Sequence, residues 1–475
     1  MLPLLPIVPV AQLSIPSIRA TPPIVAPRNS VSMQDKLSPQ EGVPAQEIIQ
    51  AQEIRSLPGR LDDIPVFNSN SPEVVLTEGI LLSTFPPNGM RVPSAHLNYA
   101  FNGRFDLFAH HISRASNPSQ TRTLFQGIVV YNPNDRPVQV DILQAASYLT
   151  RPDALFVDLP SSVEDPLGTV HAGPGSRVVN DILRGRRQGS LPTALVIPPK
   201  QAQMLMNLPI PAGTVTPTSN GRSTLMRLSS NAPVYLATVA MFAPSNPNRT
   251  ERAPTIQEWL NFLVNAGVAG PRDIAPTPPN IKTTDITYGR VAGVAKGSQW
   301  QAKLTDTSNT DYLSVPNSGR AFSYGLSLLE QGTFGTGQIQ SAPMLARYPD
   351  TAYFANGNYG IEYNLTLPLR NTTQQSQRVT LSIETPLKQD KSKNELLFLT
   401  TPDPRIFFRG TVRVRYVDDR ARPQARYFHL VQRRGQKGDS LITLTLKPGD
   451  RRLVEVDFLY PPDATPPQVL TVRSQ

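Results

Sequence analysis

Two short clusters of cationic residues are the part of this sequence best suited to bind a ligand. They are Arg184, Arg186 and Arg187 in LRGRRQG, and Arg433, Arg434 and Lys437 in QRRGQKG. An arginine side chain presents a planar fork of N–H donors that can pair with two oxygens of a carboxylate or phosphate. Two equivalent clusters could hold a repeating polyanion with avidity. Solvated loops inherited through a duplication explain the same pattern, and that alternative stays open.

Other patterns of catalysis or metal binding have little support. The chain has no cysteine, which excludes disulfides, thiolate chemistry and cysteine zinc sites. The five histidines show no HxxxH or HExxH spacing. His110 and His111 are neighbours that would point to opposite faces of a strand, although either could join His96 if a metal did bind. We therefore predict no catalytic residue, no metal site and no cofactor.

Three further sequence motifs bear on catalysis or ligand binding. No G-x-S-x-G elbow is present. GTFGTG, residues 332–337, lacks the Lys-Ser/Thr ending of a phosphate loop and is interpreted as a turn. DTSNTD, residues 306–311, lacks the glycine and glutamate that a calcium loop needs at its sixth and twelfth positions.

The arginine clusters are predicted to lie in loops, and strands are predicted for the segments around them. GIVVYNPNDRPVQVDIL, residues 127–143, alternates apolar and polar residues on both sides of a turn, and LTLPLRNTTQQSQRVTLSI, residues 365–383, does the same. Alternation with a period of two is typical of strands with one buried face. Both segments are interpreted as hairpins, with Asn132 and Asn371 at corresponding positions 239 residues apart.

A second pair of segments repeats in the same order. ALVIPPKQAQMLMNLPIP, residues 194–211, corresponds to LTLKPGDRRLVEVDFLYP, residues 444–461, and an arginine pair and Ser-Leu precede each. This order favours an internal duplication. We predict an all-β fold of two related antiparallel β-sandwich-like domains. The expected boundaries are 1–60 for a leader, 64–250 for domain 1, 251–280 for a helix and proline-rich linker, and 281–475 for domain 2.

One helix is predicted between the two domains, over residues 255–267. Thr255 and Glu258 have the spacing of a capping box, and Gly267 is suited to end the helix. Its apolar stripe is predicted to dock on a β domain, and binding of a partner is the alternative. The stripe consists of Ile256, Trp259, Leu260, Leu263 and Val264.

Composition limits the class of protein. Proline is unusually frequent, at 49 of 475 residues, which suits many short strands and turns rather than a helical bundle. The net charge of +10 favours anionic partners, although solubility alone would explain it. No basic run with interleaved aromatic residues suggests nucleic acid. No segment is long and apolar enough for a membrane helix.

The first residues, MLPLLPIVPVAQLSIP, are apolar and rich in proline, and no basic residue comes before Arg19. They lack the positive start of a signal peptide. The leader is therefore either an atypical or truncated export signal or a disordered segment.

Several segments resemble a family of uncharacterised cyanobacterial proteins, classed only as a domain of unknown function. They are PVFNSNSPEVVLTEGILLSTFPP, GRFDLFAHHISRA, NGRSTLMRLSS, YGRVAGVAKGSQWQAKLTD and FFRGTVRVRY. The resemblance covers residues 47–475. It implies a cyanobacterial origin and an exported, periplasmic or cell-envelope location, and it assigns no catalytic residues. The weak export signal departs from that expectation, and a misplaced start codon would account for it.

These observations favour a non-enzymatic protein of the periplasm or cell envelope. It would bind an anionic polysaccharide, a cell-wall polymer or another surface partner through its arginine-rich loops. A carbohydrate-active enzyme with an acidic cleft between the domains is the alternative, and a structural subunit of a larger assembly is a third. Two facing carboxylates of perturbed pKa in a concave pocket would indicate the enzyme. The oligomeric state is left open.

Overall fold

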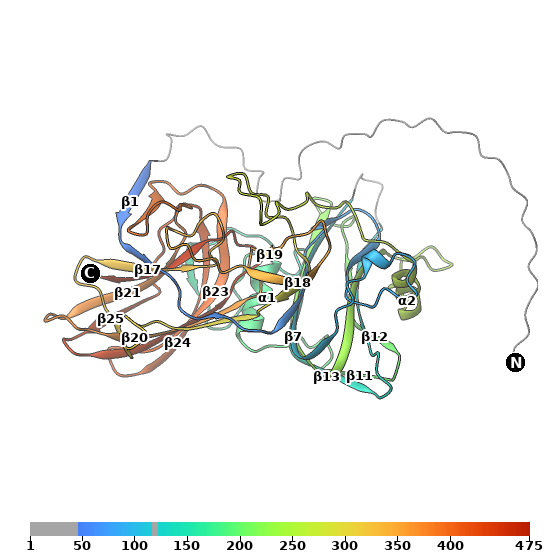
Figure 1. Ribbon diagram of the computed structural model, residues 1–475, viewed down its shortest axis with the longest axis horizontal. Coiled ribbons are helices and arrows are strands. Elements are labelled where there is room, and N and C mark those ends of the chain that lie inside the picture. Colours follow the sequence, from blue (N-terminus) through green and yellow to red (C-terminus); the bar gives the residue numbers. More distant parts are fainter. Residues whose placement is uncertain (1–45, 116–121) are drawn as a thin grey trace, which may run out of the picture. The chain divides into compact units, whose positions relative to one another are not determined.

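The computed structural model describes residues 46–115 and 122–475, and these described residues belong to one compact unit. Residues 1–45, which include the predicted export signal and most of the predicted leader, lie outside the described residues. Strands dominate the described part, which confirms the prediction of an all-β fold (Figure 1). Its helices are α1 (Pro174–Leu183), α2 (Ile256–Asn265) and the short 3-10 helix η2 (Pro93–Ala95).

The largest sheet has twelve strands and is organised around β13 (Ser219–Phe242). The first part of β13 pairs with β7 and β9, and its last part pairs with β6 and β8. The remaining strands are β4 (Pro65–Ser69), β5 (Val74–Val75), β6 (Gly79–Ser83), β7 (Phe101–Arg114), β8 (Leu124–Tyr131), β9 (Val138–Leu149), β11 (Ala194–Ile197), β12 (Ala202–Ile210), β14 (Ala292–Lys296), β18 (Ala342–Arg347) and β19 (Phe354–Ala355).

Three smaller sheets contain the other strands. The eight-stranded sheet is formed by β3 (Arg60–Leu61), β10 (Ser162–Glu164), β15 (Gln299–Lys303), β16 (Leu313–Ser314), β20 (Glu362–Arg370), β23 (Ile406–Val417), β24 (Pro423–Arg433) and β26 (Arg451–Leu459). The five-stranded sheet is formed by β2 (Glu53–Arg55), β17 (Ala321–Leu326), β21 (Gln377–Glu384), β25 (Ile442–Leu446) and β27 (Gln468–Ser474). β1 (Glu47–Ala51) and β22 (Glu395–Leu399) pair as a ribbon.

The eight- and five-stranded sheets share one hydrophobic core. Leu365 and Leu367 of β20 and Val379 and Leu381 of β21 are buried in the same cluster. The alternating apolar residues that predict strands therefore form the inner faces of a sandwich, because successive side chains of a strand point to opposite faces.

Both predicted strand–turn–strand segments form their strands, but neither is a hairpin. β8 pairs with β12 and the last part of β13, whereas β9 pairs with β11 and the first part of β13. β20 pairs with β26 and β21 pairs with β25 in a corresponding way. Each segment is thus an arch whose two strands do not pair with each other. The alternation of apolar residues could not show this, because it identifies a strand without identifying its neighbour.

The asparagine at each turn holds the arch closed. The Asn132 amide nitrogen donates to the carbonyl oxygen of Arg136 at 2.8 Å and to that of Ile197 at 2.9 Å. The Asn371 amide nitrogen donates to the carbonyl oxygen of Gln375 at 2.7 Å and to that of Leu446 at 2.8 Å. The matching bonds are what a duplication would leave, and the duplication itself stays a prediction.

Sheet membership does not follow the boundaries expected from the sequence. β1 and β2 fall within the predicted leader and β3 begins at its last residue, yet these strands pair with β22, β17 and β15. β14 falls within predicted domain 2, yet it lies between β4 and β18 in the largest sheet. The expected boundaries followed chain order, and strand pairing crosses them.

The helix predicted over residues 255–267 is present as α2. Its capping box forms, with the Glu258 backbone N–H donating to Thr255 Oγ1 and the Thr255 backbone N–H donating to the Glu258 carboxylate. Trp259 and Leu263 are buried against β6, β8 and β13, which confirms docking on a β domain (Figure 1). Ile256 and Val264 of the predicted stripe are exposed instead, so the docked face is narrower than predicted. A Cβ at Gly127 would lie 2.8 Å from the Trp259 ring, so the glycine allows this close approach.

The helix α1 was not predicted. The residue before it, Gly173, is in the N-cap position and has no side chain to cap the helix. The buried Asp463 accepts a hydrogen bond from the Ser176 backbone N–H at 3.3 Å instead. Within residues 46–115 and 122–475, neither α-helix is long and apolar enough to cross a bilayer.

Candidate functional site

The first arginine cluster follows the C-terminus of α1 and is largely occupied by contacts within the protein. The Arg184 side chain is only 7% exposed and donates to Asn180 Oδ1 at 2.9 Å and to the Pro166 carbonyl oxygen at 3.0 Å. Its guanidinium also lies 3.8 Å from the centre of the Tyr427 ring. Arg184 therefore attaches the loop before α1 to both α1 and β24.

Its two neighbours also have internal partners. Arg186 pairs with Asp181 at 3.2 Å and donates to the Leu167 carbonyl oxygen at 2.9 Å, while its side chain is 45% exposed. Arg187 donates to the Leu191 carbonyl oxygen at 2.9 Å. These bonds leave the first cluster with little freedom to hold an external anion.

The second cluster lies at the end of β24 and is more open. Arg434 lies 3.5 Å from Asp403, and the Lys437 ammonium lies 5.6 Å from the centre of the Phe398 ring. Arg433 is exposed, and in the part of the chain that the structure describes no ion pair or hydrogen bond reaches its guanidinium. Of the six predicted residues, Arg433 is the one best placed to meet a ligand.

Arg433 borders a groove of about 290 Å³. We call it the Arg433 groove. Residues 158–161 form one of its sides, and residues 401–406 form the other. The lining residues are Asp158, Leu159, Ser161, Thr401, Pro402, Ile406, Val431, Arg433 and Gln436. The groove therefore combines one unpaired cation with hydroxyl, amide, carboxylate and apolar groups.

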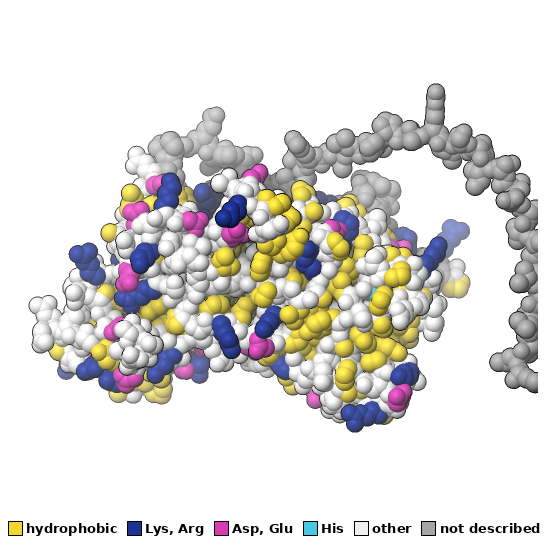
Figure 2. All heavy atoms as spheres, viewed as in Figure 1, with side chains coloured by type: hydrophobic (Ala, Val, Ile, Leu, Met, Phe, Trp, Pro, Cys, Tyr) yellow, Lys and Arg dark blue, Asp and Glu magenta, His cyan; other side chains and the backbone are white. Residues whose placement is uncertain are grey.

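The basic residues are otherwise distributed rather than concentrated. On the face shown in Figure 2, Lys and Arg side chains are scattered, and several lie beside Asp or Glu side chains. Apolar side chains gather on the same face around β18 and β19 and near α2. This face therefore offers no broad cationic platform.

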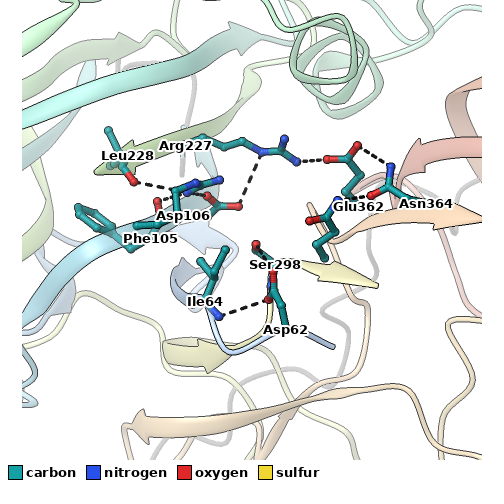
Figure 3. Close-up of polar contacts among 11 residues, drawn as sticks. Asp62, Ile64, Phe105, Asp106, Arg227, Leu228, Ser298, Glu362 and Asn364 are labelled. Carbon is teal, nitrogen blue, oxygen red and sulfur yellow. Dashed lines mark hydrogen bonds and ion pairs between the residues drawn. The ribbon is translucent and has the colours of Figure 1, made fainter. Parts of the chain in front are cut away.

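A chain of charged and polar side chains connects β7 and β13 with β20 (Figure 3). Asp106 pairs with Arg104 and lies 3.9 Å from Arg227 Nε, and Arg227 pairs in turn with Glu362. Glu362 Oε1 accepts a hydrogen bond from Asn364 Nδ2 at 2.9 Å. We call this chain of contacts the charged seam.

The charged seam contains two carboxylates, Asp106 and Glu362, that both contact Arg227, so it is the place to look for the pair of carboxylates that a carbohydrate-active enzyme would need. Burial raises the pKa of Asp106, against the opposing effect of Arg104 and Arg227. The cavity lined by Asp106 and Ser298 has a volume of about 10 Å³, which is close to the minimum for one water molecule. A sugar ring cannot enter it, so the charged seam acts as an internal ion-pair network.

The histidines are placed by internal hydrogen bonds. His110 Nδ1 lies 2.8 Å from Ser223 Oγ, and His110 Nε2 lies 3.8 Å from Glu73 Oε1. This serine–histidine–carboxylate arrangement resembles a catalytic triad. Ser223 is fully buried in β13 between β7 and β9, however, so no substrate can reach its hydroxyl. His111 and His96 hydrogen-bond to Ser69 and Ser83.

No group of three or more metal-binding side chains occurs in residues 46–115 and 122–475. The GTFGTG segment forms turns, as predicted, and its backbone holds an internal anion. The backbone N–H groups of Gly332 and Thr333 donate to Asp390 Oδ1 at 3.1 and 2.6 Å. Asp306 in the DTSNTD segment accepts hydrogen bonds from Ser314.

Comparison with known proteins gives a family without an assigned activity. A family model described as "Protein of unknown function (DUF3370)" matches residues 52–474. The comparison with curated proteins finds no match. A solved structure titled "Structure of the Macrobrachium rosenbergii Nodavirus" aligns with 97% of this chain and 98% of its own at 13% identity, but its TM-score of 0.13 carries no argument about fold. The match over residues 52–474 shows that the chain belongs to the DUF3370 family of proteins of unknown function.

Proposed function

We propose that the protein is a non-enzymatic component of the cyanobacterial periplasm or cell envelope that binds an anionic glycan or cell-wall polymer. The observation that carries this proposal is the exposed guanidinium of Arg433, which borders a groove and lacks a partner among the described residues. Arginine pairs readily with carboxylate and phosphate oxygens, and a guanidinium without an internal partner breaks no existing contact by doing so. The net charge of +10 favours approach of a polyanion.

The structure narrows the set of residues that such binding would use. Arg184 and Arg187 donate to internal acceptors, and Arg186 and Arg434 lie beside carboxylates. Recruiting any of them would break an existing contact. Among the described residues of the clusters, Arg433 and Lys437 are exposed without an ion pair or hydrogen bond to the side chain, and only Arg433 borders the groove. The proposed polymer contact therefore depends chiefly on Arg433.

Cosedimentation of the full-length protein with isolated cyanobacterial cell-wall polymer, at low and high salt, tests the proposal. Binding should weaken as salt rises, because exposed charge contacts are screened. Arg433→Gln should bind less polymer than the wild type. Arg320→Gln is the matched control, because Arg320 is also exposed and its side chain has no described partner. Absence of wild-type binding at low salt would overturn the proposal.

A further inference from the structure

The Arg433 groove is held in shape by bonds that do not depend on a ligand. The Val431 backbone N–H donates to the Ser161 carbonyl oxygen at 3.0 Å, and β10 continues this pairing along β24. On the other side, Ile406 of β23 pairs with Arg433, and the Asp403 backbone N–H donates to the Arg434 carbonyl oxygen at 3.1 Å. Both sides of the groove are thus fixed to β24, and a ligand would meet a site that is already ordered.

The polar groups of the groove fall into two kinds. Arg433 supplies a cation that can bind a carboxylate through two parallel hydrogen bonds. Asp158 is exposed and supplies an anion, and no hydrogen bond or ion pair within the described ranges uses its carboxylate. The Thr401 hydroxyl, also exposed, has no described partner either. A complementary ligand therefore carries one anionic group together with hydroxyl donors.

The apolar side chains and the volume of the groove further limit the class of ligand that would fit. Leu159 and Ile406 are partly buried and lie among the lining residues, where they can pack against the C–H groups of a ring. Clefts that enclose a drug-sized ligand have volumes of roughly 300–1,000 Å³. At about 290 Å³, the groove is near the lower end of that range and suits a single sugar residue.

We infer that the Arg433 groove is a subsite for one carboxylated sugar residue of the polymer. This inference rests on the proposed function and names the chemistry that it would recognise. The sugar carboxylate pairs with Arg433, its ring hydroxyls donate to Asp158 and bond to Thr401, and one face of the ring packs on Leu159 and Ile406.

Asp158 makes the groove selective for a carboxylated sugar over a phosphate group. A phosphate would bring more negative charge beside the Asp158 carboxylate, and like charges held together are unfavourable. A uronic acid has a single negative charge and neighbouring hydroxyl groups, which turn the same carboxylate into a useful acceptor. A neutral sugar would leave the Arg433 guanidinium without a partner in the groove.

Isothermal titration of the full-length protein with a galacturonic acid trisaccharide tests the subsite. A galactose trisaccharide of the same linkage is the neutral comparison, and inorganic phosphate is the anion comparison. We expect the acidic trisaccharide to bind at least about tenfold more tightly than either, in line with one charge-assisted contact of about 1.4 kcal/mol or more. Equal affinity for the acidic and neutral trisaccharides would overturn the inference.

Three variants connect that affinity to the groove. Arg433→Gln should weaken acidic trisaccharide binding at least tenfold, Asp158→Asn should reduce its preference over phosphate, and Arg320→Gln should bind as the wild type does. Wild-type affinity in Arg433→Gln would overturn the inference even if the trisaccharide binds.

The two proposals fail in different ways. Salt-dependent cosedimentation with polymer, combined with no trisaccharide binding, would refute the subsite and support the proposed function. Trisaccharide binding that needs Arg433, combined with no cosedimentation, would support the subsite and refute the proposed envelope function.

Discussion

Replacing His429 should reduce the loss of stability that acidification causes. The His429 side chain is fully buried on β24, its Nδ1 lies 3.4 Å from Thr411 Oγ1, and its Nε2 has no partner among the described residues. Burial lowers the pKa of His429 from 6.5 to about 4. In the unfolded chain the ring is protonated below pH 6.5, so the unfolded state binds the extra proton between pH 6.5 and about 4. Stability present at pH 7 is therefore lost as the pH falls through this range.

The magnitude follows from the width of the titrated range. From pH 6.5 to pH 5 the range spans about 1.5 pH units, and each unit corresponds to about 1.4 kcal/mol, so His429 lowers the free energy of unfolding by about 2 kcal/mol at pH 5. We expect urea denaturation of the full-length protein, followed by tryptophan fluorescence, to show this effect. The difference in unfolding free energy between pH 7 and pH 5 should be about 2 kcal/mol smaller in His429→Gln than in the wild type.

A control separates titration from simple loss of packing. Leu430→Ala removes a buried side chain next to His429 and should lower stability at both pH values while keeping the wild-type difference between them. The charged groups that influence the pKa of His429 are Asp165, His171 and Arg409, and all three remain in both variants. An identical pH dependence in His429→Gln and the wild type would refute the reasoning.

Three further predictions concern stability and the role of Arg184. Trp259→Ala should lower the free energy of unfolding by about 3–5 kcal/mol, because it empties a fully buried indole site, whereas Val264→Ala on the exposed face of α2 should cost about 0.5 kcal/mol or less. Arg227→Met should cost about 3 kcal/mol, since two carboxylates of the charged seam lose a partner, and an unchanged urea midpoint would contradict this. Arg184→Ala should cost about 1–3 kcal/mol and leave polymer binding unchanged. Lost binding in a variant that circular dichroism shows to be folded would contradict the structural role of Arg184.

The two helices show which features of the fold the sequence could predict. The signals for α2 are local, because Thr255 and Glu258 cap it three residues apart. The cap of α1 is Asp463, which lies 287 residues beyond Ser176. No local signal reveals such a partner, and Gly173, Pro174 and Gly175 suggest a loop. The spacing of the apolar residues after them was the available signal: Val178, Val179, Ile182 and Leu183 are all buried.

The candidate site, like α1, depends on contacts between distant residues that the sequence pattern does not predict. Arginine clusters can be found in a sequence, but whether each guanidinium is free depends on segments that are distant along the chain. Arg184 lies against Tyr427 of β24, which is remote in sequence. Arg433 has no such partner among the described residues. Similar sequence motifs thus place one arginine inside the protein and leave the other open.

This difference argues against a grip by two equivalent clusters. Arg184, Arg186 and Arg187 follow a helix, whereas Arg433 is the last residue of a strand and Arg434 comes directly after it. The clusters are therefore not presented by equivalent elements. Avidity requires two sites that one ligand can occupy together, and the first cluster is already engaged internally. Binding through Arg433 alone would involve few charge contacts and would depend only gently on salt. A steep salt dependence would instead require contacts from cations in addition to Arg433.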